Sequence, residues 1–144
     1  MRLRTPMVTA RPSRSVLLTA AIVGAMGFAS HGVPQTKQPA QKGFATPEQA
    51  GQRLVQAAQR YAVAALLDIL GTDAKDLVLS EDPVLDKNRG LAFAALAHER
   101  QSITPDPRNP DRVTLSVGNS DWPLPIPIVK RNKNWYYDSK AGRN

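Results

Sequence analysis

The spacing of hydrophobic residues changes along this chain, and each change marks a different kind of segment. An unbroken apolar run from Val16 to Ala29 comes first. Between residues 46 and 100 apolar residues recur every three or four positions, the spacing of amphipathic helices. Beyond residue 112 they alternate with polar residues, as in half-buried strands. This order predicts an α+β domain, with two to three N-terminal helices packed on a three- to four-stranded antiparallel meander.

Three helices are expected, and local signals mark their ends. Thr46-Pro47-Glu48-Gln49 is a capping box with proline at the first helical position, so the first helix begins at Pro47. Residues 62–70 form a second helix or continue the first one with a bend, and Gly71 ends this segment. Asp82-Pro83 repeats the start signal for a third helix that reaches about Arg100. Its expected buried stripe consists of Leu85, Ala92, Phe93, Ala95 and Leu96.

Turns and strands are expected in the C-terminal part. Residues 104–112 contain three prolines and predict a turn or loop. Residues 113–117 form the first strand, and turns at 118–121 and 132–134 delimit strands at 122–129 and 135–137. Prolines at 123, 125 and 127 remove alternate N–H groups, so this strand is expected to lie at an edge or to leave its neighbour. Its core-facing residues would be Leu124, Ile126 and Ile128; a polyproline ligand for an aromatic groove is the alternative.

The first 29 residues are typical of a secretory signal peptide. Four arginines and no acidic residue precede the 14-residue apolar run, which is shorter than the about 20 residues of a membrane-spanning helix. Gly27 and Ala29 are small, as cleavage after Ala29 requires. An uncleaved membrane anchor is the alternative. Residues 30–43 are polar and are expected to form a disordered linker, so the folded domain is expected over 44–144.

Composition and charge exclude several classes of function. The chain has 144 residues, 19 Lys and Arg, 12 Asp and Glu, and no cysteine, which excludes disulfide scaffolds, thiolate chemistry and a lipid-modified N-terminal cysteine. Four of the basic residues precede the apolar run. Residues 43–129 hold 8 basic and 11 acidic side chains, whereas residues 130–144 hold 5 and 1. The net charge of +7 therefore reflects an export signal and a basic hairpin, and no nucleic-acid partner is expected.

Few residues are candidates for site chemistry. His98 is the only histidine after residue 43, and with Asp86 it could support acid–base chemistry in a pocket between helix and sheet. No group of residues has the spacing of a metal site, and no nucleotide-binding motif is present, so neither a metal nor a cofactor is expected. Three basic residues next to aromatic ones could contact an envelope polyanion, although a solvated hairpin is the favoured explanation: Lys130, Arg131 and Lys133.

Several stretches follow one family pattern. The most specific is D-W-P-L-P-I-P at residues 121–127; the others are residues 44–48, 64–71, 80–86, 134–138 and 141–143. Together they resemble the bacterial exported family called domain of unknown function 2950, from residue 44 to the end. The resemblance implies an exported protein without an assigned activity, and it transfers no catalytic residue. Family members continue for a comparable length, so this chain is expected to correspond to their first half. The motif residues expected to be structural are Asp121, Trp122, Pro123, Pro125, Pro127 and Trp135.

These observations favour a non-catalytic binding or interaction module. We expect a periplasmic or secreted protein of a Gram-negative-type bacterium, with a protein or envelope component as partner and no stable membrane anchor after signal cleavage. An exposed apolar patch near Trp135–Asp138 or the C-terminus would mark the partner surface. Two alternatives stay open. One is a small-ligand-binding or acid–base enzyme domain with a pocket between helix and sheet, and the other is a polyanion binder using the basic hairpin.

Overall fold

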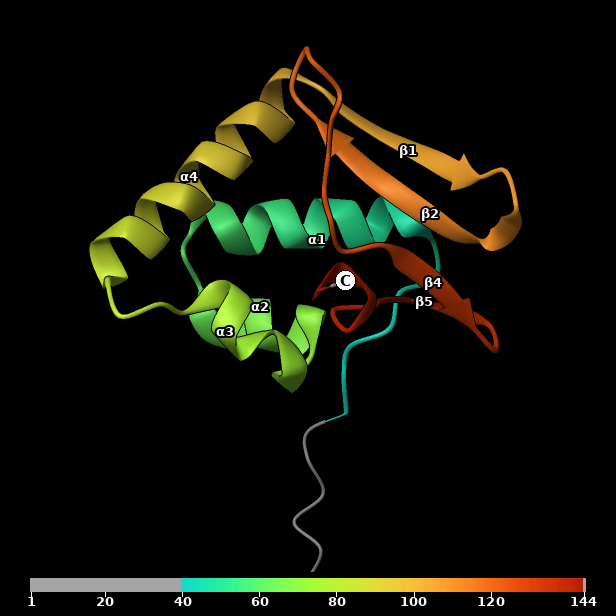
Figure 1. Ribbon diagram of the computed structural model, residues 1–144, viewed down its shortest axis with the longest axis horizontal. Helices are drawn as coiled ribbons and strands as arrows, with labels where there is room; N and C mark the ends of the chain where they lie inside the picture. The colour runs from blue at the N-terminus through green and yellow to red at the C-terminus, as the bar shows by residue number, and fades with distance from the viewer. Residues whose placement is uncertain (1–39, 144) are drawn as a thin grey trace, which may run out of the picture. The chain divides into compact units, whose positions relative to one another are not determined.

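The computed structural model describes residues 40–143, in which helices precede strands (Figure 1). The α+β prediction is confirmed. The expected signal peptide, most of the expected linker and Asn144 lie outside the described residues. The helices are α1 (Pro47–Gln59), α2 (Val63–Leu70), α3 (Lys75–Val78) and α4 (Pro83–Glu99), with 3-10 turns at Thr72–Ala74 and Ala141–Arg143. The strands are β1 (Gln101–Asp106), β2 (Asn109–Val117), β3 (Trp122–Pro123), β4 (Ile128–Arg131) and β5 (Asn134–Tyr137).

All strand pairs are antiparallel, and the strands follow the order β1-β2-β4-β5, with the short β3 also paired to β2. One face of this sheet packs on α1, which passes behind β2 in Figure 1. Helix α1 and strand β2 approach closely at Gly51 of α1, where an added Cβ would lie 3.4 Å from Cδ1 of Leu115 in β2. The side chains that are almost completely buried lie on this face: Leu115, Val117, Ile128 and Tyr137.

The expected helix ends are confirmed by their hydrogen bonds. The N–H of Gln49 donates to Thr46 Oγ1 over 3.2 Å, which caps α1. Asp82 Oδ1 accepts from the N–H groups of the first turn of α4, over 3.0 and 2.9 Å. Tyr61, with φ of 47°, separates α1 from α2, so the second helix is a distinct one. Gly71 ends α2 with φ of 88°, a conformation that glycine adopts without strain.

The prediction of a loop at 104–112 is wrong. These residues complete β1 and begin β2, and only Pro107 and Arg108 form the turn between them. Pro105 is tolerated because β1 lies at the edge of the sheet, where its missing N–H breaks no pairing on the outer side. The carboxylate of Asp106 accepts from the N–H of Arg108 over 2.8 Å, which stabilises the turn.

The expected strand at 122–129 is two short strands with a gap. β3 and β4 both pair with β2, and residues 124–127 leave the sheet between them. The alternate prolines account for this gap, as expected, while the N–H of Leu124 still donates to Leu115 over 2.8 Å. Ile126 and Ile128 are buried and Leu124 is half-buried, so the expected core-facing set is confirmed.

Both ends of the described chain are bonded to α2 and the sheet. The side-chain amide of Gln41 donates to the carbonyls of Ile69 and Tyr137, over 3.0 and 2.7 Å. The N–H of Lys42 donates to the backbone carbonyl of Asp68 over 2.8 Å. Gln41 and Lys42, which the composition assigns to a linker, are therefore hydrogen-bonded to the domain. At the other end the buried Ser139 hydroxyl donates to the carbonyl of Leu70 over 2.7 Å.

Candidate functional site

Helix α4 buries its small residues instead of its large ones. Its buried residues are Asp86, Ala94 and Ala97. Gly90 lies on the same face, since it is one turn before Ala94, and an added Cβ there would lie 3.4 Å from the carbonyl oxygen of Ala58 in α1. The small residues therefore let α4 approach α1 closely.

The buried stripe expected for α4 is consequently wrong. Ala92 and Ala95 are exposed, and Leu85 and Leu96 keep 41% and 38% of their surface exposed. Only Phe93 of the expected stripe packs against the core, and only partly. Apolar residues stand on every side of α4, so the close contact with α1 decides which face is buried.

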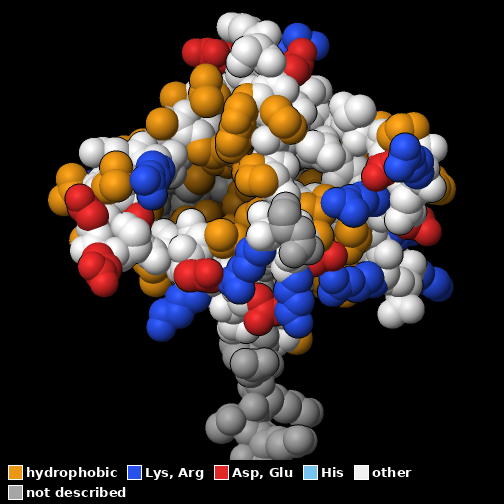
Figure 2. All heavy atoms as spheres, in the orientation of Figure 1, with side chains coloured by type: hydrophobic (Ala, Val, Ile, Leu, Met, Phe, Trp, Pro, Cys, Tyr) orange, Lys and Arg blue, Asp and Glu red, His pale blue; other side chains and the backbone are white. Residues whose placement is uncertain are grey.

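Two of the large apolar residues of α4, Phe93 and Leu96, line a groove of about 490 Å³. Trp122 of β3 and Ile126 of the segment between β3 and β4 line it from another side, and Leu70 of α2 and Leu77 of α3 also line it. Figure 2 shows hydrophobic side chains gathered around a hollow in this face of the molecule. The groove is almost entirely apolar, and its volume lies within the about 300–1,000 Å³ of small-molecule sites. The remaining lining residues are Leu54, Ala58, Tyr61, Leu66, Val78, Asp86, Arg89, Gly90, Ala92 and Leu124.

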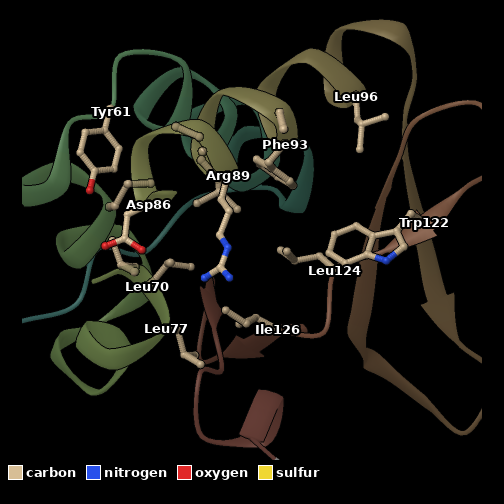
Figure 3. Close-up of a pocket in the computed structure, with 16 residues that line it drawn as sticks. Tyr61, Leu70, Leu77, Asp86, Arg89, Phe93, Leu96, Trp122, Leu124 and Ile126 are labelled. Carbon is tan, nitrogen blue, oxygen red and sulfur yellow. The ribbon is translucent and has the colours of Figure 1, made fainter. Parts of the chain in front are cut away.

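Arg89 is the only cation among the residues that line the groove. Its side chain extends from α4 into the groove, toward Leu124 and Ile126 (Figure 3). Within residues 40–143 the five ion pairs involve other cations, and Arg89 donates no hydrogen bond to another side chain or carbonyl there. The groove thus contains one positive charge that forms no ion pair or hydrogen bond within the described part of the chain, although its charge helps to lower the pKa of Asp86, three positions earlier in α4.

Asp86, a candidate acid–base residue, is occupied by a structural contact. Its Oδ2 accepts from the Ser80 N–H over 2.7 Å, and its Oδ1 accepts from the Ser80 hydroxyl over 2.8 Å. These two hydrogen bonds hold the pKa of Asp86 below its ordinary value of 3.8. A carboxylate with a lowered pKa is a poor proton carrier near neutral pH, so Asp86 fastens the loop before α4.

His98, the other candidate, lies away from the groove. It is exposed near the end of α4, and its Nε2 is 3.3 Å from Oε1 of Gln59. Twelve positions separate it from Asp86, which corresponds to about 18 Å along a helix. The structure therefore does not bring the two candidate acid–base residues together.

The basic hairpin formed by β4 and β5 does not direct its cations to one surface. Lys130 stacks over Trp135 at 5.8 Å, and Arg131 over Tyr136 at 5.9 Å. Neighbouring residues of a strand point to opposite faces, so these two cations diverge. Arg131 also approaches Asp138 at 3.8 Å, and Lys133 is an exposed residue of the turn.

The family-motif residues have different surroundings. Asp121 lies in the turn before β3 with φ of 49°, and its carboxylate forms an ion pair with Arg100 at 3.2 Å. Trp135 is half-buried and exchanges backbone hydrogen bonds of 2.9 and 2.7 Å with Phe44. Trp122, in contrast, keeps 47% of its surface exposed at the edge of the groove. The prolines Pro123, Pro125 and Pro127 account for the gap between β3 and β4. Pro127 is buried, and the other two are exposed.

The residues from 134 to 138 are buried or half-buried except for Asn134, so the exposed apolar surface is not where the sequence placed it. It lies at the groove and on α4. Sequence reasoning missed Arg89 and Leu77 as groove residues, and the only available signal was that apolar residues stand on every side of α4. Within the described range no group of three or more acidic or histidine residues could hold a metal ion. Among the helices of that same range, none is long and apolar enough to cross a membrane.

Comparison with known proteins gives one match. No curated protein and no solved structure matches the chain. Residues 41–144 match a protein family, and the match begins at Gln41, the first described residue whose side chain is hydrogen-bonded to the domain. The chain therefore belongs to the family described as protein of unknown function (DUF2950).

Proposed function

We propose that this chain is a non-catalytic binding module that takes an apolar ligand into the groove beside α4. The observation that carries this proposal is the inverted packing of α4, which buries alanines and leaves Phe93 and Leu96 at the groove. Exposed apolar surface costs free energy in water, about 25 cal/mol per Å². A fold that buries small residues and exposes large ones around a hollow is therefore suited to covering that surface with a ligand.

The arrangement of polar groups favours binding over catalysis. The two candidate acid–base residues are far apart, and Asp86 is held ionised by Ser80. A polyanion site is less well supported, because Lys130 and Arg131 stack on aromatic rings on opposite faces of the hairpin.

Export of the chain is part of the same proposal. It rests on the four arginines and the apolar run of residues 1–29, and it places the binding module in the periplasm or outside the cell. Mass spectrometry of the protein recovered from a bacterial host tests it. A mature chain that begins at Ser30 supports export with cleavage, and an intact Met1 terminus contradicts it.

Binding of a neutral fluorescent probe, N-phenyl-1-naphthylamine, tests the groove. We expect fluorescence enhancement with the purified protein, and loss of binding in Leu96→Gln, because Leu96 lines the groove. The matched control is Leu91→Gln, since Leu91 lies on the same helix with the same 38% exposure but does not line the groove. Equal loss in both variants, or no enhancement with the unsubstituted protein, would contradict the proposal.

A further inference from the structure

The groove has a chemical asymmetry that narrows the class of ligand. Its walls are leucine, isoleucine and aromatic side chains, and Arg89 contributes the single cation. The single acidic residue among the lining residues, Asp86, already accepts two hydrogen bonds from Ser80. The Arg89 guanidinium projects into an apolar groove, and among the described residues it forms no ion pair and donates no hydrogen bond. It can therefore donate hydrogen bonds to the anionic group of a ligand whose apolar part contacts the walls.

Building on the proposed function, we propose that the groove binds a single-chain amphiphile with a carboxylate head, of the fatty-acid class. The hydrocarbon chain lies between α4 and the Trp122–Ile126 segment, and the carboxylate accepts hydrogen bonds from the Arg89 guanidinium. One cation neutralises the one negative charge of a carboxylate. A phosphate monoester carries up to two negative charges at neutral pH, of which the second would have no partner among the lining residues.

The size of the groove favours a chain-like molecule over a helix of a partner protein. Two turns of an α-helix with side chains, about 10 Å across and 11 Å long, occupy roughly 850 Å³. The groove holds about 490 Å³. A helix would therefore fill it with one face only and would leave its other faces outside, whereas a single hydrocarbon chain can lie within it.

Displacement of N-phenyl-1-naphthylamine by three twelve-carbon compounds tests the assignment. Dodecanoate, dodecanol and dodecyl phosphate are compared below their aggregation concentrations. We expect dodecanoate to bind about tenfold more tightly than dodecanol, because of the hydrogen bonds to a charged group at a partly exposed site. Shortening the acid to decanoate and octanoate should weaken binding by up to about fourfold per methylene group.

Two variants assign the head group to Arg89. Arg89→Met should remove the tenfold preference for dodecanoate over dodecanol. Lys87→Met is the matched control, since it removes the same charge from an exposed position of α4 that does not line the groove, and it should leave both affinities unchanged. Circular dichroism of both variants confirms that the fold is retained.

The outcomes separate this inference from the proposed function. Probe binding without a preference for dodecanoate overturns the carboxylate assignment and leaves the groove as a binding site. Tighter binding of dodecyl phosphate also overturns it, as does an equal loss of dodecanoate affinity in Arg89→Met and Lys87→Met. Probe binding that no chain-like compound displaces points instead to a protein segment as occupant. Absence of probe binding overturns both proposals.

Discussion

Two alanines that are neighbours in α4 test its packing. Ala94 keeps 2% of its surface exposed, whereas Ala95 is exposed to solvent. Replacing either one with leucine adds the same three carbon atoms to the same helix. At Ala94 these atoms must enter the contact with α1, which is close enough that a Cβ on Gly90 would lie 3.4 Å from a carbonyl oxygen of α1. At Ala95 they extend into solvent.

Overpacking of this kind costs about 1–3 kcal/mol, whereas an exposed alanine-to-leucine change stays within about 0.5 kcal/mol. For a domain of this size, 1 kcal/mol shifts the melting temperature by about 4–8 °C. We therefore expect Ala94→Leu to lower the melting temperature by roughly 5–20 °C and Ala95→Leu to change it by less than about 4 °C. Thermal unfolding followed by circular dichroism measures both. If Ala95→Leu proves the more destabilising variant, α4 packs with its large residues inward and the groove account fails.

Three further predictions concern stability. Gly118→Ala should destabilise the domain by about 1–2 kcal/mol in urea unfolding, because Gly118 has φ of 77° and an added Cβ would lie 3.1 Å from Leu96 Cδ2. An unchanged midpoint would contradict that conformation. Tyr137→Phe should leave stability equal or higher, because the Tyr137 hydroxyl is buried without a hydrogen-bond partner in the described structure and burial raises its pKa; a clear loss in calorimetry would reveal a missed partner. Asp86→Asn should lower stability at pH 7 and flatten the acid side of its pH profile. The folded-state pKa of Asp86 is lowered, so its contribution is present above pH 3.8 and is lost as the pH falls through the folded-state pKa; parallel pH profiles for the two proteins would refute this role.

The helix ends could be predicted because their signals are local. Thr46 and Asp82 each accept from N–H groups two or three residues ahead, so the contact is contained in a few consecutive residues. The gap between β3 and β4 was predictable for the same reason, since alternate prolines act on their own backbone. The strand β1 was missed because its proline is tolerated only at a sheet edge, and the position of a strand in a sheet is not a local property.

The groove could not be predicted from the spacing of apolar residues. The sequence of α4 offers both a large stripe and a small one, and the choice between them depends on how closely α1 approaches. Arg89 carries no distinguishing mark in the sequence. Arg100 and Arg131 have the same side chain, and only the fold shows that each of them forms an ion pair whereas Arg89 forms none among the described residues.

The two tryptophans allow the most direct measurement. Trp122 lines the groove and Trp135 does not, and the chain contains no other tryptophan. In the variant Trp135→Phe, dodecanoate with a bromine atom on its chain should quench the fluorescence of Trp122, because the bromine would lie in the same groove. In the variant Trp122→Phe, the same compound should leave Trp135 unquenched. Quenching of Trp135 alone, or equal quenching of both tryptophans, would show that the amphiphile binds elsewhere and would contradict the account.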